Sequence, residues 1–298
     1  MEQIIQLKKI AQYNDFKQIE TKHPLISVFD NSGTKVWANQ SKLHFGYYAI
    51  FLKAGHCGNL KYGRNAYDYD EGTLVFVAPG QVIEINNEEN YKPSGLTLLF
   101  HPDLIKGTSL AKQMDKYTFF SYDFHEALHL SLKEQQMLKD IFRKLEYEIE
   151  QSIDKHSKSI IVSTIELLLN YCVRFYDRQF TTRENLNVDV LSKFENLLND
   201  YFSSGKAQNI GLPLVGYFAD CLHLSSNYFG DLIKKETGKT AQEHIQLKLI
   251  DLAKERIFDT EKSVGQIASE LGFKYPQHFN RMFKKYTGFT PVAYRKVN

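Results

Sequence analysis

Short runs of hydrophobic residues, separated by turn-forming residues, dominate the first third of the chain, from about His23 to Ile105. These runs are rich in Val, Ile, Phe and Tyr and are bounded by Gly, Pro, Asn or Asp. The pattern is typical of the strands of a small β-sandwich or barrel. Several runs are apolar at consecutive positions, which favours strands that are covered on both faces. The runs are 25–29, 43–52, 73–77, 81–85 and 95–100.

The hydrophobic period changes to three and four residues in the middle of the chain. Ser131–Ser152 and Ser159–Tyr176 each carry one apolar stripe, which predicts two amphipathic helices. Only a few polar residues separate them, so a helical hairpin is expected, with stripes available for a second copy or for the chain's own β region. Polar residues follow at Arg178–Asn187 and predict a linker.

The rest of the chain is predicted to be helical and contains an internal repeat. Ala219–Leu224 matches Ala268–Phe273 at an offset of 49, and the residues after each block match at an offset of 50. Each copy predicts a short helix, a tight turn and a second helix that ends at Gly, which is the helix-turn-helix pattern. Gly272 suits the left-handed conformation of such a turn, whereas His223, its counterpart in the first copy, suits it less.

One long helix is expected between the two copies, over Thr240–Phe258, with Thr240 as its N-cap. Nineteen residues span about 28 Å at the usual helical rise. Successive major grooves on one face of B-DNA lie about 34 Å apart. A rigid spacer of this length would allow the two second helices to enter adjacent grooves.

Charge is nearly balanced over the 298 residues, at +2, but it is unevenly distributed. No acidic residue follows Glu270, whereas six basic residues do. This local field favours a nucleic-acid partner, although a solvated basic helix end would give the same composition. The six are Lys274, Arg281, Lys284, Lys285, Arg295 and Lys296.

Gly211–Lys296 resembles the DNA-binding domain of the AraC/XylS family of bacterial transcription regulators. The densest match is Ser263–Gly288, and it is completed by Thr290-Pro291 and Tyr294-Arg295. The first copy, Ala219–Gly238, is also similar to the family's. The N-terminal β region resembles the cupin-like sensor domain of many such regulators, and the two middle helices lie where the family often dimerises.

The resemblance implies an α+β chain with four parts. Residues 1–125 would form a cupin-like sensor domain, a β-barrel or sandwich, and 126–178 a helical hairpin that dimerises. Residues 179–190 would be a linker, and 191–298 an all-α DNA-binding domain. Its helix-turn-helix motifs would lie near 212–238 and 263–288, joined by the long helix.

The implied function is sequence-specific binding of promoter DNA by a homodimer. Arg281 could pair with guanine and Gln277 with adenine in the major groove, while lysines would neutralise phosphates. The first copy has no net charge over Ser225–Gly238 and is expected to give fewer, more selective contacts. The expected DNA-contacting residues are Ser226, Asn227, Tyr228, Asp231, Lys234, Lys274, Tyr275, Pro276, Gln277, His278, Arg281, Lys284 and Lys285.

An alternative is a metal-dependent cupin enzyme that uses His44, His56 and Glu84. These residues lack the closely spaced His pair of catalytic cupins, and a catalytic metal needs three protein ligands. No phosphate-binding Gly-rich loop or nucleophile elbow suggests another chemistry. We therefore expect no enzyme activity, no metal and no cofactor.

A second alternative is a regulator whose β domain only mediates protein contacts. The aromatic residues of Phe45–Phe51 allow either a lined cavity for a small-molecule effector or a packed core. The pattern leaves open the effector, the target sites and the direction of regulation, and RNA polymerase is a further partner to consider.

The three cysteines, Cys57, Cys172 and Cys221, are far apart and show no CxxC spacing, so they are expected to be reduced thiols. The N-terminus does not resemble a signal peptide, and no uncharged apolar stretch approaches 18 residues. These features favour a cytoplasmic protein without a membrane partner.

Overall fold

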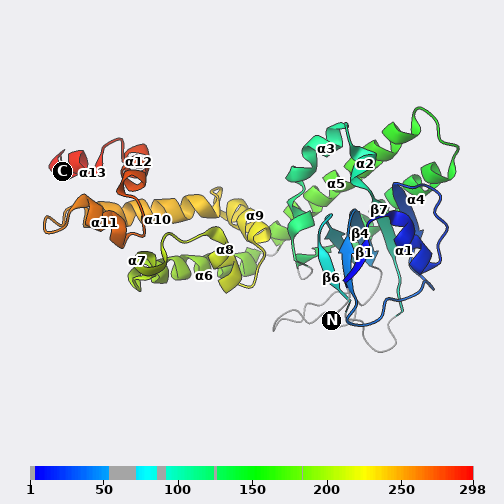
Figure 1. Ribbon diagram of the computed structural model, residues 1–298, viewed down its shortest axis with the longest axis horizontal. Helices are drawn as coiled ribbons and strands as arrows, with labels where there is room; N and C mark the ends of the chain where they lie inside the picture. The colour runs from blue at the N-terminus through cyan, green and yellow to red at the C-terminus, as the bar shows by residue number, and fades with distance from the viewer. Residues whose placement is uncertain (1–3, 54–71, 86–91, 124–125, 183, 298) are drawn as a thin grey trace. The chain divides into compact units, whose positions relative to one another are not determined.

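The computed structural model describes residues 4–53, 72–85, 92–123, 126–182 and 184–297 (Figure 1). The chain divides into two compact units, Met1–Thr182 and Arg183–Asn298. Strands occur in the first unit, and the second is helical wherever it has regular structure. The chain is therefore α+β, as the sequence predicted.

Two β-sheets form the framework of the first unit. Their neighbouring strands are antiparallel, except that β1 runs parallel to β3. The three-stranded sheet has the order β1 (Ile4–Leu7), β3 (Lys42–Phe45), β6 (Val82–Glu84). The five-stranded sheet has the order β2 (Ile26–Asp30), β7 (Leu96–Phe100), β4 (Tyr48–Lys53), β5 (Thr73–Val77), β8 (Leu128–His129).

The apolar run 43–52, expected as one strand, is divided between the two sheets. Its first part is β3 and its second part is β4, with Gly46 between them. The amide of Gly46 donates to the carbonyl oxygen of Leu7 at 2.9 Å. A Cβ at Gly46 would lie 3.1 Å from that oxygen, so the close approach of β1 favours glycine at the break.

The main core of this unit combines strands of both sheets with α1 (Ile10–Lys17). Tyr13 of α1 lies among the rings of Phe29, Trp37 and Phe45, with centroids 6.0–6.2 Å apart. The opposite side of the larger sheet is also covered, since Phe76 of β5 packs on Phe119 at 4.3 Å. All five residues of β5 are buried, which confirms for this strand the expectation of cover on both faces.

The predicted helical pair is present as α4 (Leu132–Glu150) and α5 (Ser157–Thr182). Ser131 caps α4, and the buried stripes include Leu138 and Phe142 on α4 and Ile165 and Leu169 on α5. These stripes pack within the first unit, so they are not the dimer surface considered from the sequence. Shorter helices before this pair are α2 (Pro102–Ile105), α3 (Ser109–Gln113), η1 (Met114–Lys116) and η2 (Thr118–Ser121).

The segment 179–190, expected as a linker, is helical on both sides of residue 183. α5 continues to Thr182, and α6 (Glu184–Ser203) begins two residues later. The linker prediction rested on polar composition and was wrong, because polar side chains of this segment are buried and hydrogen-bonded. The Nε2 of Gln179 donates to the Ala127 carbonyl at 3.3 Å, and the Nδ2 of Asn187 donates to Glu236 at 2.7 Å.

By length and hydropathy, 25 residues of α5, Ser157–Thr181, would be able to cross a membrane. This differs from the expectation of no such segment. Ile165, Leu168 and Cys172 of this helix have no exposed surface. The buried core helix of a globular unit can have the same length and hydropathy as a helix that crosses a membrane. Burial raises the pKa of the Cys172 thiol, which accordingly remains a thiol at neutral pH.

Eight helices make up the described part of the second unit. The ring of Phe194 meets those of Phe218 and Phe229 edge to face, with centroids 5.2 and 5.1 Å away, and these contacts join α6 to the first helix-turn-helix. The helices after α6 are α7 (Lys206–Ile210), α8 (Val215–Cys221), α9 (Ser226–Thr237), α10 (Ala241–Arg256), α11 (Val264–Glu270), α12 (Pro276–Thr287) and α13 (Pro291–Val297).

The long helix between the two copies is α10, and Figure 1 shows it between α9 and α12. Thr240 caps it as predicted, since the Oγ1 of Thr240 accepts from the Glu243 amide. The helix has 16 residues instead of the predicted 19 and so spans about 24 Å. The helix ends at Arg256. Just after it, the carbonyl oxygens of Ile257 and Asp259 accept hydrogen bonds from Arg295.

Candidate nucleic-acid interface

The two copies of the repeat fold into equivalent turns. In the first, the Leu224 amide donates to the Ala219 carbonyl at 2.9 Å, and in the second the Phe273 amide donates to the Ala268 carbonyl at 2.9 Å. Both alanines have no exposed surface. The small side chain therefore lies where the two helices of each motif approach, and both helix-turn-helix motifs are confirmed as structural units.

Residues in a left-handed conformation occupy the same place in both turns. Gly272 has φ +93°, and His223 has φ +57°, so the first turn forms despite its less suitable residue. A Cβ on Gly272 would lie 2.8 Å from the Ala207 carbonyl oxygen and 2.9 Å from the carbonyl carbon of Gly211. The second turn is thus packed against the chain around α7, and glycine is required there by space as well as by φ.

One face of α12 is buried and the other is covered with polar side chains. Phe279 and Phe283 have no exposed surface, and Pro276 stands at the first helical position, where it fits without loss of a hydrogen bond. The opposite face is exposed, and every residue that the sequence assigned to DNA contact in the second copy is exposed on this helix or just before it. These exposed residues are Lys274, Tyr275, Pro276, Gln277, His278, Arg281, Lys284 and Lys285.

Asn280, which was not among the residues expected from the sequence, is also exposed on this helix. It lies three residues after Gln277 and four before Lys284, so helical spacing alone places it beside them. An amide side chain can both donate to and accept from base edges, which adds Asn280 to the candidate contacts.

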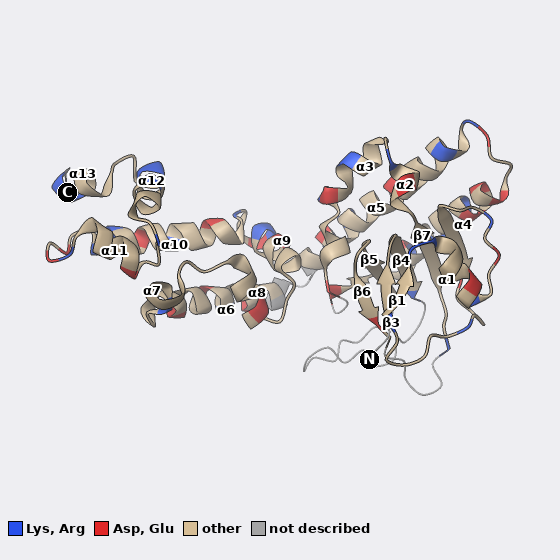
Figure 2. Cartoon of the chain, viewed as in Figure 1, with Lys and Arg blue, Asp and Glu red and all other residues tan. Residues whose placement is uncertain are grey.

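The cations of the α12 surface are not paired with carboxylates. Among the residues that the structure describes, no carboxylate oxygen lies within 4 Å of Lys274, Arg281, Lys284 or Lys285. Figure 2 shows the blue segments on α12 and α13. A cluster of unpaired cations on one helix is suited to contact an anionic partner.

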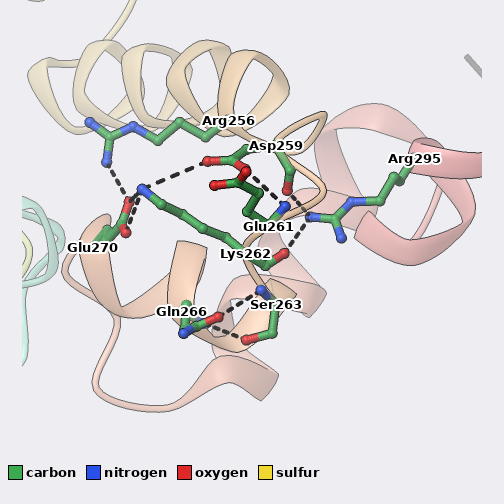
Figure 3. Close-up of polar contacts among 8 residues, drawn as sticks. All are labelled: Arg256, Asp259, Glu261, Lys262, Ser263, Gln266, Glu270 and Arg295. Atoms are coloured by element: carbon green, nitrogen blue, oxygen red, sulfur yellow. Dashed lines mark hydrogen bonds and ion pairs between the residues drawn. The ribbon is translucent and has the colours of Figure 1, made fainter.

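Glu270, the last acidic residue, forms ion pairs with cations outside α12 (Figure 3). Its carboxylate lies 2.8 Å from the Nζ of Lys262 and 3.6 Å from Arg256. The hydrogen bond with Glu270 raises the pKa of Lys262 above its usual value. The negative charge of Glu270 is therefore balanced at the junction of α10 and α11.

Arg295 does not contribute to the α12 surface as the charge count suggested. Its guanidinium donates to the carbonyl oxygen of Ile257. It also donates to those of Asp259 and Lys262, the last at 3.0 Å (Figure 3). These bonds satisfy the end of α10 and the loop that follows it. The role of this arginine is to join α13 to that loop.

The first copy differs from the second in net charge, because its two lysines are offset by two acidic residues. Ser226, Asn227 and Lys234 of α9 are exposed, and Asp231 is half-buried. Tyr228, expected to point outward, is only 6% exposed, because it lies on the same helix face as the buried Phe229 and Leu232. Tyr228 is therefore corrected to a packing residue of this motif.

The metal-site alternative can be examined at two of its three residues. His44 and Glu84 lie on the paired strands β3 and β6, and the carboxylate of Glu84 faces Lys42 at 4.0 Å. His56 lies outside the described residues. Within the described ranges, no three His, Cys, Asp or Glu side chains are grouped closely enough to bind a metal ion.

Comparisons with known proteins agree on the second unit. Residues 218–297 match a family described as "Helix-turn-helix domain". The transcriptional regulatory protein YesN of Bacillus subtilis is 34% identical over 109 residues, which are 36% of this chain and 28% of YesN. The chain thus spans less than a third of that relative.

A second relative is similar over more of the chain. The probable transcriptional regulator LumQ of Photobacterium leiognathi is 22% identical over 230 residues, covering 76% of this chain and 83% of LumQ. Among solved structures, the C-terminal domain of a YesN response regulator from Fusobacterium nucleatum is 26% identical. It covers 36% of this chain and 98% of its own, with a TM-score of 0.32.

Proposed function

We propose that the protein is a sequence-specific DNA-binding regulator of transcription of the AraC type, because residues 218–297 match a helix-turn-helix family. The exposed polar face of α12, whose cations have no carboxylate within 4 Å in the described part of the chain, carries the proposal. A DNA partner would make the cytoplasm the place where the protein acts. Its similarity to transcriptional regulators favours a function without catalysis, metal or cofactor.

In this proposal α12 reads base edges in the major groove. Arginine can donate two hydrogen bonds to O6 and N7 of guanine, and glutamine can pair with N6 and N7 of adenine. Arg281 and Gln277 lie four residues apart and are both exposed, so they would share one groove. Tyr275, Pro276 and His278 at the start of the helix would shape this contact.

Lysines would supply the sequence-independent attraction. Lys284 and Lys285 follow Arg281 along α12, and Lys274 precedes the helix. Each lysine that neutralises a phosphate releases counterions and increases the salt dependence of binding.

The first motif has no net charge over Ser225–Gly238, and it would add selectivity to binding. The Asn227 amide can pair with adenine, and a carboxylate such as Asp231 can accept from N4 of cytosine but repels phosphates. Ser226 and Lys234 are exposed on the same helix and would contact the backbone. We expect the second motif to provide most of the affinity.

The base-reading role of α12 is tested with Arg281→Ala and Lys284→Ala on a bound promoter fragment. Removing Arg281 is expected to cost about 1–3 kcal/mol on the preferred sequence and to leave binding to random DNA little changed. Lys284→Ala is the matched control, because it should weaken binding to both sequences equally. Competition gel shifts measure both effects, and equal losses on both sequences for Arg281→Ala would contradict base reading.

The first unit is proposed to control this activity. A cupin-like domain that binds a small molecule could do so only if the ligand favours one arrangement of the protein over another. Its described residues include a cavity between the strands, which favours an effector over a domain that only binds proteins. RNA polymerase would be the partner through which bound regulator changes transcription.

A homodimer is proposed through the face of α5 that the unit leaves uncovered. Ile160 and Leu167 are 47% and 44% exposed, and Tyr171 is half-buried on the same side. Spacings of seven and four residues put these side chains on one helix face. Two copies of a DNA-binding unit would match a site with two-fold symmetry.

A further inference from the structure

The cavity of the first unit lies between the two sheets and α1. Its volume is about 150 Å³, comparable to an apolar protein cavity that admits a benzene-sized ring. The walls come from α1, β3, β4, β5 and β6 and from the segments that flank β2 and β7. The lining residues with large apolar or aromatic side chains include Tyr13, Trp37, Phe45, Phe51, Val75 and Ile83.

Lys17 is the unusual group of this lining. It is the last residue of α1 and is only 6% exposed. Its Nζ donates to the Lys35 carbonyl at 2.8 Å and to the Thr34 hydroxyl at 3.4 Å, and it lies 5.9 Å from the Tyr13 ring centroid. These partners are neutral, so they do not balance the charge of the ammonium group.

The other charged group of the lining is also a cation. Lys53, at the end of β4, lines the cavity, and no Asp or Glu is among the described residues that do so. The side chains that β3, β5 and β6 contribute to the lining do not titrate. On α1, the phenol of Tyr13 is the other titratable group of the lining besides Lys17. Lys35, whose backbone holds Lys17, directs its own ammonium over the Phe16 ring at 4.9 Å.

From this geometry we infer that the cavity binds a small organic anion, a carboxylate with a compact apolar or one-ring body, with Lys17 as its counter-ion. The carboxylate would meet the ammonium groups of Lys17 and Lys53, and its apolar body would pack among the aromatic rings. An opposite charge beside a buried ammonium offsets the cost of burying it. The inference rests on the proposed control of the regulator by a small molecule and names the chemistry of that molecule.

The protonation of Lys17 supports this assignment. Burial lowers its pKa from 10.5 to about 8. The side chain is therefore mostly charged at pH 7 and mostly neutral at pH 9 when the cavity holds no anion. A bound carboxylate would raise this pKa again, so binding of the anion should weaken about tenfold from pH 7 to pH 9.

The test compares acids with their own amides on the full chain. Benzoate, phenylacetate and hexanoate have the same shapes as benzamide, phenylacetamide and hexanamide but carry a charge. Trp37 is the chain's single tryptophan and lines the cavity, so its fluorescence reports on binding at this site. At pH 7, at least one acid is expected to bind ten times more tightly than its amide and to lose about tenfold at pH 9, while amide binding stays constant.

Lys17→Met should reduce the preference for the acid to about one, and Lys53→Met should reduce it less. Thermal unfolding shows whether both variants are folded, and the acid–amide and pH comparisons on the unchanged chain stand without them. If no acid of the panel is preferred over its amide, or if the preference survives in folded Lys17→Met, the inference is overturned. DNA binding measured in the same preparation separates this outcome from a failure of the proposed regulatory function.

Discussion

Single residues decide the two turns of the DNA-binding unit in different ways. His223 and Gly272 occupy equivalent positions with positive φ. Only Gly272 also lies against a neighbouring backbone, at Ala207 and Gly211, so only there does a side chain meet an obstacle. The same turn therefore tolerates histidine in one copy and requires glycine in the other.

Gly272→Ala is expected to destabilise the chain by about 3 kcal/mol, because it adds both left-handed strain and a clash with backbone. His223→Gly should change the free energy of unfolding by less than about 1 kcal/mol, since relief of strain is offset by the greater flexibility of glycine. Urea denaturation measures both variants. Equal changes in the free energy of unfolding would show that the contact of Gly272 with the α7 region does not contribute to stability.

The sequence predicted the parts of this site that depend on local pattern. Periodicity located α11 and α12, and the repeat located both turns, because these features are encoded by neighbouring residues. The carbonyl contacts of Arg295 depend on packing between distant elements, so the charge count misassigned this residue. The break at Gly46 and the helical ends on either side of residue 183 were missed for the same reason. Tyr228 was assigned from the resemblance of the motif, although helical spacing already places it beside the buried Phe229 and Leu232.

At the scale of elements, α13 is joined to the end of α10 by one arginine. Arg295 bonds to three carbonyl oxygens, whereas the next residue, Lys296, is exposed. Both add the same formal charge to the C-terminal region. Their contributions to stability should nevertheless differ.

Arg295→Met is expected to lower the free energy of unfolding by about 2 kcal/mol, since it leaves carbonyl oxygens without their charged donor. Lys296→Met is the matched control and should have little effect on stability. Chemical denaturation of both variants provides the measurement. If the two variants were equally stable, the structural role of Arg295 would be wrong.

The α12 helix is expected to dominate the salt dependence of DNA binding. Replacing Lys284 and Lys285 together by Ala should lower the slope of log K against log salt by about 1.8, the value for two phosphate contacts. The pair Asn227→Ala and Asp231→Ala in α9 should leave the slope nearly unchanged. Binding titrations over a range of salt test this, and an unchanged slope in the lysine variant contradicts the assigned role.

At the scale of the whole molecule, the proposed assembly depends on the uncovered face of α5. Leu167→Glu would place a charge at its centre and should convert a dimer to monomers at micromolar concentration. Leu132→Glu is a control, because Leu132 is 73% exposed at the start of α4, away from this face. Sedimentation velocity distinguishes the states, and a monomeric unmodified chain would exclude the proposed dimer.

The proposed function requires that two linked helix-turn-helix motifs read DNA sequence. Selection from a pool of random duplexes by the full chain, at about 150 mM salt, tests it most directly. If both motifs read DNA, the recovered duplexes should share two contacted segments about 10 base pairs apart, one helical turn, as two adjacent grooves require. Recovery of a pool without sequence preference would contradict it.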